Sequence, residues 1–553
     1  MASPQSLEGN VLPNKTSHES LPNYTLDEKE GGDVIRIPQT AQAAYKGIFS
    51  PRRMQVIALG GSIGSGLFIT TGRGLSTGGP GGFVFGYGYV AILVFCVLQL
   101  LTEMTIAFPV SGNLFEYADR WVDPALAFAA GFAEWIGWTA VCAAEATMFT
   151  VLINYWADGQ VHDAVWLTIF LIIVFGLFFL PSKAFAWFEY VTSLVKVTAF
   201  LIIFFSSIAI MAGGGPTGRV HSGETWRDYT KFKNGFAGIA QCMMLACWAY
   251  GDQVFIGIMG GEAFFPRLAM GRACKMVTGR MFVIYMMSVM WISLLVPSDD
   301  SRLYGGSSTT ASPFIIAMSN AGITGLPHFL NAAIVVGVTA IACESIYIAS
   351  RTLRSLAAQG LIPKFMAEVD DKGRPRWSLL VTSVVTITLT YINLSSGGVT
   401  VFTWFTSITS SSFFSIWIVL VIVSWRFRAA LKAQNDPLFN QIYAWKANFW
   451  IFTITWLALG CALLTAACIY IGLYPVDGDG VSVESFFQYV LGLIMILTSY
   501  FGYKIIFRTK IRDPKTVDLM SDRRPLTDDD IAELDAYYKQ PMYRRFGSYF
   551  TIW

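Results

Sequence analysis

Four glycines interrupt an apolar stretch near the start of this chain, within the run Gly60-Gly61-Ser62-Ile63-Gly64-Ser65-Gly66. Glycine disfavours a helix because it has the most backbone freedom to lose, so the run predicts unwound backbone inside a helix over 54–76. Lipid cannot satisfy bare N–H and C=O groups, so such a break at bilayer depth must be buried in protein or line a cavity. The chemistry it could perform is the binding of a polar solute. The alternative is close helix packing through small residues.

Ionisable side chains also fall inside apolar stretches. Lys196 is one of them. A lysine at bilayer depth costs about 2.5–3.5 kcal/mol on insertion scales, so it should be paired, deprotonated or facing water, unless it snorkels to the interface. Glu134 and Glu145 are eleven residues apart, close to three helical turns, and therefore share one face. We expect that face to look into the protein, for either structural pairing or proton relay.

Membrane-spanning helices must position these residues. The 553-residue chain is 54% hydrophobic and only 14% charged, whereas soluble domains carry about a quarter charged residues. Apolar runs recur at the length of about 20 residues that crosses the hydrocarbon core. We expect an all-α polytopic membrane protein with twelve spans, over 54–76, 81–107, 125–156, 164–181, 187–212, 236–260, 281–297, 328–350, 378–394, 401–424, 449–472 and 485–507.

The loops expected on one side of the membrane hold most of the loop lysines and arginines, above all over 267–280 and 351–376. The positive-inside rule places these loops and both termini in the cytoplasm. The predicted parts are a disordered cytoplasmic N-terminal tail (1–50), a transport core of ten helices (51–424), two accessory helices (425–507) and a cytoplasmic C-terminal tail (508–553).

A second break lies five spans after the first. The span over 236–260 is interrupted by Trp248-Ala249-Tyr250-Gly251-Asp252-Gln253. Two glycine-broken helices at corresponding positions of two five-helix halves point to a transporter binding site.

Several motifs, in order along the chain, resemble fungal amino-acid permeases of the amino acid–polyamine–organocation (APC) superfamily. They include GGSIGSGLF at 60–68, EMTIAFPVSG at 103–112, YADRWVDPAL at 117–126 and ASRTL at 349–353. The resemblance covers about 45–510. It implies a LeuT-like 5+5 inverted repeat with discontinuous first and sixth helices, and secondary active transport of amino acids.

The substrate site follows from the zwitterion of an amino acid. The N–H groups around Gly64, Ser65 and Gly66 begin a half-helix whose dipole favours an anion, so they should hold the carboxylate. By the resemblance, carbonyls near Ser62, Cys247 and Tyr250 hold the ammonium. The expected substrate-binding residues are Ser62, Ile63, Gly64, Ser65, Gly66, Cys247, Trp248, Ala249, Tyr250 and Gly251. For the aromatic residues Trp248 and Tyr250, lipid or core packing is the alternative.

The resemblance also implies proton coupling through Lys196, because proton-coupled relatives have a lysine in this helix beside the unwound first helix. Two positions depart from the family pattern. Many relatives have Gly-x-Glu where this chain has Gly251-Asp252-Gln253, and many have a small or amide residue where it has Glu344. Asp252, Gln253, Glu145 and Glu344 are therefore candidates for a gate or side-chain pocket. Glu344 could pair with a protein cation or with a cationic substrate.

The sequence thus predicts a multi-pass carrier of the plasma membrane that imports amino acids by proton symport with alternating access. The alternatives are a carrier of choline, a polyamine or a specialised-metabolite precursor, and an amino-acid sensor that hardly transports. The Gly64-Ser65-Gly66 motif favours a cargo with a carboxylate, and tails of ordinary length favour transport. The sequence has no metal cluster, nucleophile motif or phosphate loop, so we expect no enzyme, metal or cofactor. The expected partners are amino acids, protons and lipid, without nucleic acid.

Overall fold

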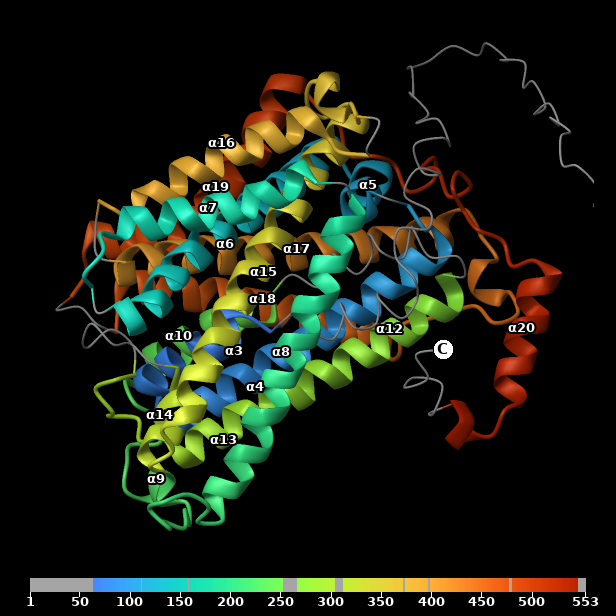
Figure 1. Ribbon diagram of the computed structural model, residues 1–553. Coiled ribbons are helices and arrows are strands. Elements are labelled where there is room, and N and C mark those ends of the chain that lie inside the picture. The colour runs from blue at the N-terminus through green and yellow to red at the C-terminus, as the bar shows by residue number, and fades with distance from the viewer. Residues whose placement is uncertain are drawn as a thin grey trace, which may run out of the picture. The chain divides into compact units, whose positions relative to one another are not determined.

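A computed structural model describes residues 63–110, 112–157, 159–180, 182–251, 266–303, 312–370, 373–395, 398–476 and 480–545. All of them belong to one of the two units into which the chain divides, Pro38–Trp553. Apart from one isolated bridge between Ala212 and Val220, the regular structure of these residues is helical (Figure 1). The long helices are α4 (Thr70–Ala107), α6 (Pro124–Ala157), α7 (Asp163–Phe179), α8 (Ser182–Met211), α10 (Gly235–Tyr250), α12 (Pro266–Met281), α15 (Gly325–Ala358), α16 (Arg376–Ile392), α17 (Gly398–Ala433), α18 (Trp450–Leu473) and α19 (Val483–Phe507).

Short helices connect or extend the long ones. They are α3 (Ser65–Phe68), α5 (Asn113–Trp121), α9 (Glu224–Arg227), the π-helix η1 (Phe282–Met286), α13 (Met287–Leu295), α14 (Pro313–Asn320), the 3₁₀ turns η2 (Lys364–Ala367) and η3 (Leu438–Asn440), and α20 (Asp528–Lys539). The π-helix η1 joins α12 to α13 without a loop, so the three form one continuous helix, of which Met270–Leu295 is long and apolar enough to cross a membrane.

Each of the twelve expected ranges overlaps at least one of these helices. Among the described residues, eight helical stretches are long and apolar enough to cross a membrane, and α7, α10 and α16 are shorter apolar helices. One of the eight, Ser65–Ala107, runs from within the first expected span to the end of the second. Gly79 bends it there, with φ +67° and ψ 174°, and Pro80 follows. Only glycine adopts that backbone conformation readily. A Cβ at this position would also lie 2.4 Å from the Thr230 carbonyl.

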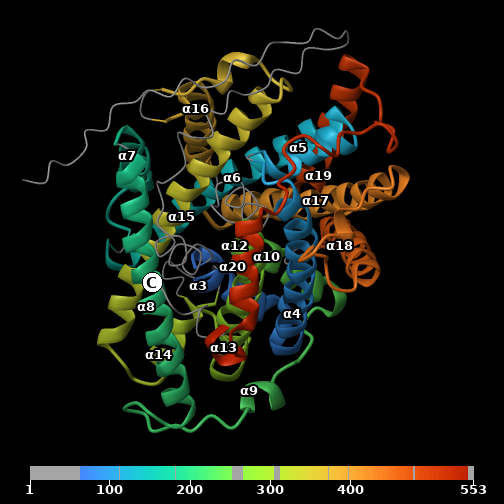
Figure 2. The same cartoon turned by 90° about the vertical axis from the view of Figure 1, so that its right-hand side faces the viewer.

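Burial separates inner from outer helices. In the most apolar 18-residue stretch of each helix, 83% of the stretch is buried in α6 but only 22% in α19. The inner helix α6 packs against α15 and α17, and α10 packs against α4. Figures 1 and 2 both show α3 surrounded by longer helices. Because α19 and α18 carry exposed Phe, Ile and Leu side chains, their outer faces have the composition of lipid-facing surfaces.

The C-terminal segment 508–545 folds back onto the helix ends. The Trp121 indole donates to the Asp518 carbonyl at 3.1 Å, and the Arg523 guanidinium donates to Asp436 Oδ2 at 2.6 Å. Tyr443, after η3, bonds to Asp535 of α20 and stacks on Tyr538 with ring centroids 5.5 Å apart. This part of the expected C-terminal tail is therefore docked on the remaining helices.

Candidate functional site

The first helix break is visible at the start of α3. Gly64 has an extended backbone, with φ −154° and ψ −153°, and α3 begins at the next residue. The Leu67 and Phe68 amides donate to the Gly64 carbonyl at 3.1 Å. The N–H groups of Ser65 and Gly66 lie at the start of this turn, before any N–H group that can bond to a carbonyl of the same helix. They therefore have no acceptor within their own helix. Ser62, near which a carbonyl is expected to accept from the substrate ammonium, lies outside the described residues.

The second break lies at the end of α10. Gly251 has φ +68°, a left-handed value that glycine adopts without strain. Its amide donates to the carbonyls of Cys247 and Trp248, each at 3.2 Å, so these two carbonyls already accept one bond. Asp252 and Gln253, the expected gate residues, lie outside the described residues.

The two breaks touch each other. A Cβ on Gly66 would lie 2.7 Å from Cα of Ala249, and a Cβ on Gly64 would lie 2.7 Å from Cγ1 of Ile341 in α15. Real Cβ atoms do not approach a backbone carbon that closely, so the absence of a side chain at Gly66 allows α3 to lie directly on the last turn of α10. The fold therefore brings together two segments almost 190 residues apart.

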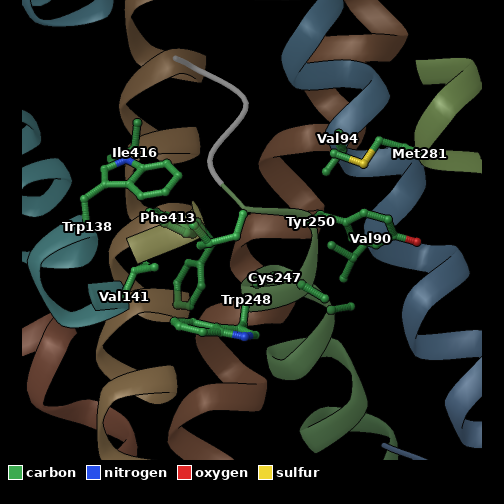
Figure 3. Packing of buried hydrophobic residues seen from close by; sticks show 14 of the residues in the cluster. Val90, Val94, Trp138, Val141, Cys247, Trp248, Tyr250, Met281, Phe413 and Ile416 are labelled. Atoms are coloured by element: carbon green, nitrogen blue, oxygen red, sulfur yellow. The ribbon is translucent and has the colours of Figure 1, made fainter. Parts of the chain in front are cut away.

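The aromatic residues of α10 point in opposite directions, as Figure 3 shows. Tyr250 is 1% exposed, lies beside Val90 of α4, and donates from its hydroxyl to the Tyr87 carbonyl at 3.1 Å. Trp248 lies on the side of Phe413 and packs edge-on against Phe402 with centroids 5.9 Å apart. In this conformation the Tyr250 hydroxyl is used by the protein itself. The neighbouring Ala249 carbonyl likewise accepts from the Tyr285 hydroxyl.

Glu145 lies beside the first break. The Ser65 hydroxyl donates to Glu145 Oε1 at 2.6 Å, and Glu145 is 2% exposed. Its other oxygen, Oε2, is buried without a hydrogen-bond donor. Buried carboxylate oxygens are costly unless they are hydrogen-bonded or neutralised, so this atom has room for one further donor.

Lys196 of α8 lies on the other side of the first break. It is fully buried, and a Cβ on Gly337 would lie 3.6 Å from Lys196 Cγ and 3.7 Å from the Ile63 carbonyl. The lysine stem and the start of the first break thus flank the same glycine of α15. The Lys196 ammonium lies 3.5 Å from Glu189 Oε1.

Two further buried charges were missed by the sequence reasoning. Glu189 precedes Lys196 by seven residues, two helical turns on one face, and that spacing is a signal that could have found it. Arg73 of α4 falls within the expected first span and is 4% exposed. Its guanidinium donates to the Thr403 hydroxyl of α17 at 2.6 Å, which ties α4 to α17.

The remaining expected carboxylates lie on two different helices. Glu134 of α6 accepts from the Trp138 indole at 2.8 Å, a pairing within one helix. Glu344 is on α15, within Coulombic range of Glu189, Lys196 and Arg280. The described residues provide no ion pair closer than 4.0 Å for Glu344. The structure thus places Glu344 within Coulombic range of Lys196, whereas Glu145 is hydrogen-bonded to Ser65.

A separate pocket lies between the docked C-terminal segment and the helix ends. It is lined by residues that include Glu103, Arg267, Tyr443, Arg524 and Asp530. The Glu103 carboxylate is ion-paired with Arg428 there, with Nε 2.8 Å from Oε1. Glu103 therefore anchors the α4 end to α17, as a loop anchor would, and takes no part in the site around Gly64.

The comparisons with known proteins agree with this architecture. The family model described as "Amino acid permease" matches residues 53–515. The chain is 33% identical over 519 residues to amino-acid permease GAP3 of Candida albicans, which covers 92% of this chain and 86% of that protein. It is 32% identical over 495 residues to the general amino-acid permease GAP1 of Saccharomyces cerevisiae, in an alignment that covers 87% of this chain and 80% of that protein. It is also 31% identical over 481 residues to the S-adenosylmethionine permease GAP4 of Candida albicans, in an alignment that covers 86% of this chain and 78% of that protein.

Proposed function

This chain belongs to the amino-acid permease family, a family of multi-pass membrane transporters rather than enzymes, and from that premise we propose that it imports amino acids by proton symport. It does so by alternating access, through twelve membrane crossings arranged as a LeuT-like 5+5 repeat in the plasma membrane. Residues 51–424 form the transport core and 425–507 the accessory helices. Both termini, 1–50 and 508–553, are cytoplasmic.

The contact between Gly66 and Ala249 carries the proposal. It joins the start of α3, where the Ser65 and Gly66 amides have no acceptor within their own helix, to the end of α10, where the carbonyls of Cys247, Trp248 and Ala249 each accept one bond and can accept a second. Helix N-termini favour anions and exposed carbonyls favour cations. In this proposal one α-amino-acid zwitterion binds at the edge of this contact, with its carboxylate at Gly64–Gly66 and its ammonium near Ile63 and the carbonyls of Cys247–Tyr250.

Lys196 supplies the proton coupling in this proposal. Its stem and the Ile63 carbonyl flank Gly337, and its amine is within Coulombic range of Glu145, which is bonded to Ser65 at the first break. A protonated amine there stabilises the unwound backbone that holds the substrate, and a neutral amine does not. Binding of substrate and binding of a proton are then linked, because each stabilises the state that the other prefers.

The side-chain selectivity has a second candidate. The relative named as an S-adenosylmethionine permease is named for a cargo that combines an α-amino-acid group with a cationic sulfonium. Such a cargo would use the same carboxylate and ammonium contacts. Its cation would need a carboxylate nearby, and Glu145, with an unpaired buried oxygen, is a candidate for that contact. A cationic cargo is therefore included in the test.

Competitive uptake tests the function. Cells lacking their own carriers would express the chain and take up a mixture of radiolabelled amino acids at about pH 5 and about pH 7.5. Single amino acids, S-adenosylmethionine, choline and a polyamine would serve as unlabelled competitors. We expect faster uptake at the lower pH and competition only by compounds with an α-amino-acid group. Absence of uptake of every amino acid, in cells whose membranes contain the protein, would refute the proposal.

A further inference from the structure

Two contacts fix how α8 lies against α15, which are neighbours in Figure 1. Near the start of α8, Phe185 stacks on Tyr347 with ring centroids 4.5 Å apart. Further along, Lys196 meets Gly337. As the residue number rises along α8 it falls along α15, so the two helices are antiparallel. Glu189 and Glu344 lie between these two contacts, at matching heights on the facing sides.

Glu189 is buried and Glu344 is partly buried, and both carboxyl groups are poorly satisfied. Glu189 is 2% exposed, and neither of its oxygens accepts a hydrogen bond. Glu344 Oε2 is buried and also lacks a donor. The Ser193 hydroxyl, one turn from Glu189 on the same helix, is fully buried and has no partner either. A hydrogen on one of the carboxyl groups would supply a donor for one of these acceptors.

The charges that face this place do not balance. Coulombic interactions link six ionisable groups here in a chain of pairs from α6, α8, α12 and α15, namely Glu145, Glu189, Lys196, Arg280, Cys343 and Glu344. The thiol of Cys142 and the phenol of Tyr285 adjoin them and are neutral. With the Cys343 thiol neutral, the six groups comprise three carboxyl groups and two cations. Leaving an uncompensated negative charge in a low-dielectric interior is expensive. Two carboxylates that face each other avoid that cost by holding one proton between them.

We propose that Glu189 and Glu344 share one proton and form a second proton-binding site next to Lys196. With that proton in place the six groups are neutral as a set. When Lys196 gives up its own proton, Glu189 accepts it while the shared proton stays on Glu344. An N–H bond breaks and an O–H bond forms, leaving a neutral amine beside two neutral carboxyl groups. The role of this step in transport rests on the proposed function, but the shared proton itself does not.

Infrared spectroscopy detects the shared proton without any transport. A protonated carboxyl group absorbs separately from an ionised carboxylate. In purified wild-type protein at neutral pH we expect a band from a buried protonated carboxyl group. Either E344Q or E189Q should remove it, because the single carboxyl group left beside Lys196 and Arg280 would ionise. If one variant fails to fold, the other carries the test.

Glu134→Gln is the matched control, because Glu134 is a buried carboxyl group of α6 that is bonded to Trp138 and stands outside this set of six groups. The Glu189–Glu344 band should persist in this variant. A wild-type spectrum without a protonated carboxyl band would overturn the proposal, and so would a band that survives both E344Q and E189Q. The first result would indicate that Arg280 neutralises Glu344 instead.

The pH profile of substrate affinity tests the functional part. Glutamine resembles the protonated carboxyl group, so E344Q should bind substrate like the wild type at low pH and retain that affinity when the pH is raised about two units. The wild type and Glu344→Asp, which keeps a titratable group, should lose about tenfold over that interval. An E344Q profile parallel to that of the wild type overturns the inference while the proposed function stands. A wild type that binds no amino acid at any pH refutes the proposed function. In that case the infrared spectrum still tests whether Glu189 and Glu344 share a proton.

Discussion

The Ser65 hydroxyl donates to Glu145 Oε1 at 2.6 Å and so joins the first turn of α3 to the middle of α6. The bond holds the break in the first apolar stretch against the most buried long helix. It also leaves Glu145 Oε2 buried without a donor. The carboxylate is therefore fixed in position while one of its oxygens stays available.

Replacing Ser65 by Ala should weaken substrate binding by about tenfold or more, because a hydrogen bond to a charged group contributes about 1.5–3 kcal/mol. Ser65→Thr keeps the hydroxyl and should restore most of the affinity. Ser76→Ala, which removes only a bond to the Arg73 carbonyl one turn away, is the control. Equal substrate affinities of the Ser65→Ala variant and the wild type, measured by equilibrium binding, would show that this bond does not support the site.

The glycines of the first break should be intolerant of side chains. Gly64→Leu is expected to abolish uptake while the protein still inserts, because the side chain would occupy the proposed carboxylate position. Gly66→Ala should reduce uptake strongly, since its Cβ would lie 2.7 Å from the Ala249 backbone. Gly88→Ala, whose Cβ would make only an ordinary 3.4 Å contact, should behave as the wild type. Retention of wild-type substrate affinity by Gly64→Leu would exclude this placement of the carboxylate.

The sequence was sufficient for the family and for the location of most helices, because both depend on local information. Apolar length marks a membrane helix, and a glycine-rich run marks a break. The ordered motifs between 60 and 364 predicted the amino-acid permease family, and the family match over 53–515 confirmed it. Gly79 shows the same principle, because the kink that separates two expected spans lies where glycine and proline adjoin.

Contacts between helices were beyond the reach of the sequence. The register of α8 against α15 depends on how Phe185 and Tyr347 pack, and no pattern in either helix specifies that pairing. The seven-residue spacing of Glu189 and Lys196 places both on one face of α8, but nothing in the sequence indicates that Glu344 of α15 lies within Coulombic range of them. The docking of Arg523 and Tyr443 likewise depends on loops that share no periodicity.

Lys196→Ala should give uptake that no longer responds to pH, because the variant has no amine to gain or lose a proton beside the first break. We expect residual, downhill uptake at one rate between about pH 5 and about pH 7.5. Lys233→Ala is the control, since this lysine is paired with Asp299 at 2.7 Å in a loop. Should the Lys196→Ala variant keep the wild-type pH profile, the proton coupling assigned to this residue would be wrong.

Asp123 should make stability depend on pH at the start of α6. It is buried, caps the helix by accepting from the Ala125 amide at 2.9 Å, and is paired with Lys504. Burial raises the pKa of the Asp123 carboxyl, but the hydrogen bonds from Lys504, Thr509 and Ala125 outweigh it and lower the pKa below its usual value of 3.8. A lowered folded-state pKa stabilises the protein above the unfolded-state pKa, and this contribution is lost as the pH falls through the folded value.

We therefore expect Asp123→Ala to lower the free energy of unfolding by about 0.5–2 kcal/mol at neutral pH. Asp123→Asn should cost less, because the amide oxygen can still cap the helix. The difference between wild type and variant should shrink below about pH 4, as followed by thermal unfolding in detergent. A difference that stays constant down to about pH 3 would mean that the Asp123 charge contributes nothing.

The C-terminal segment provides a prediction that is independent of the substrate site. Tyr443→Phe removes the hydrogen bond to Asp535 of α20 but keeps the ring that stacks on Tyr538. Losing one such bond costs about 0.5–1.5 kcal/mol, and local opening depends on that local free energy. Amide hydrogen exchange across Asp528–Lys539 should become up to about tenfold faster, while exchange in α6 stays unchanged. Tyr474→Phe, at an exposed tyrosine, should leave both unchanged. If α20 exchanges as slowly in Tyr443→Phe as in the wild type, contacts other than Tyr443 hold the segment, and Arg523 with Asp436 becomes the pair to remove next.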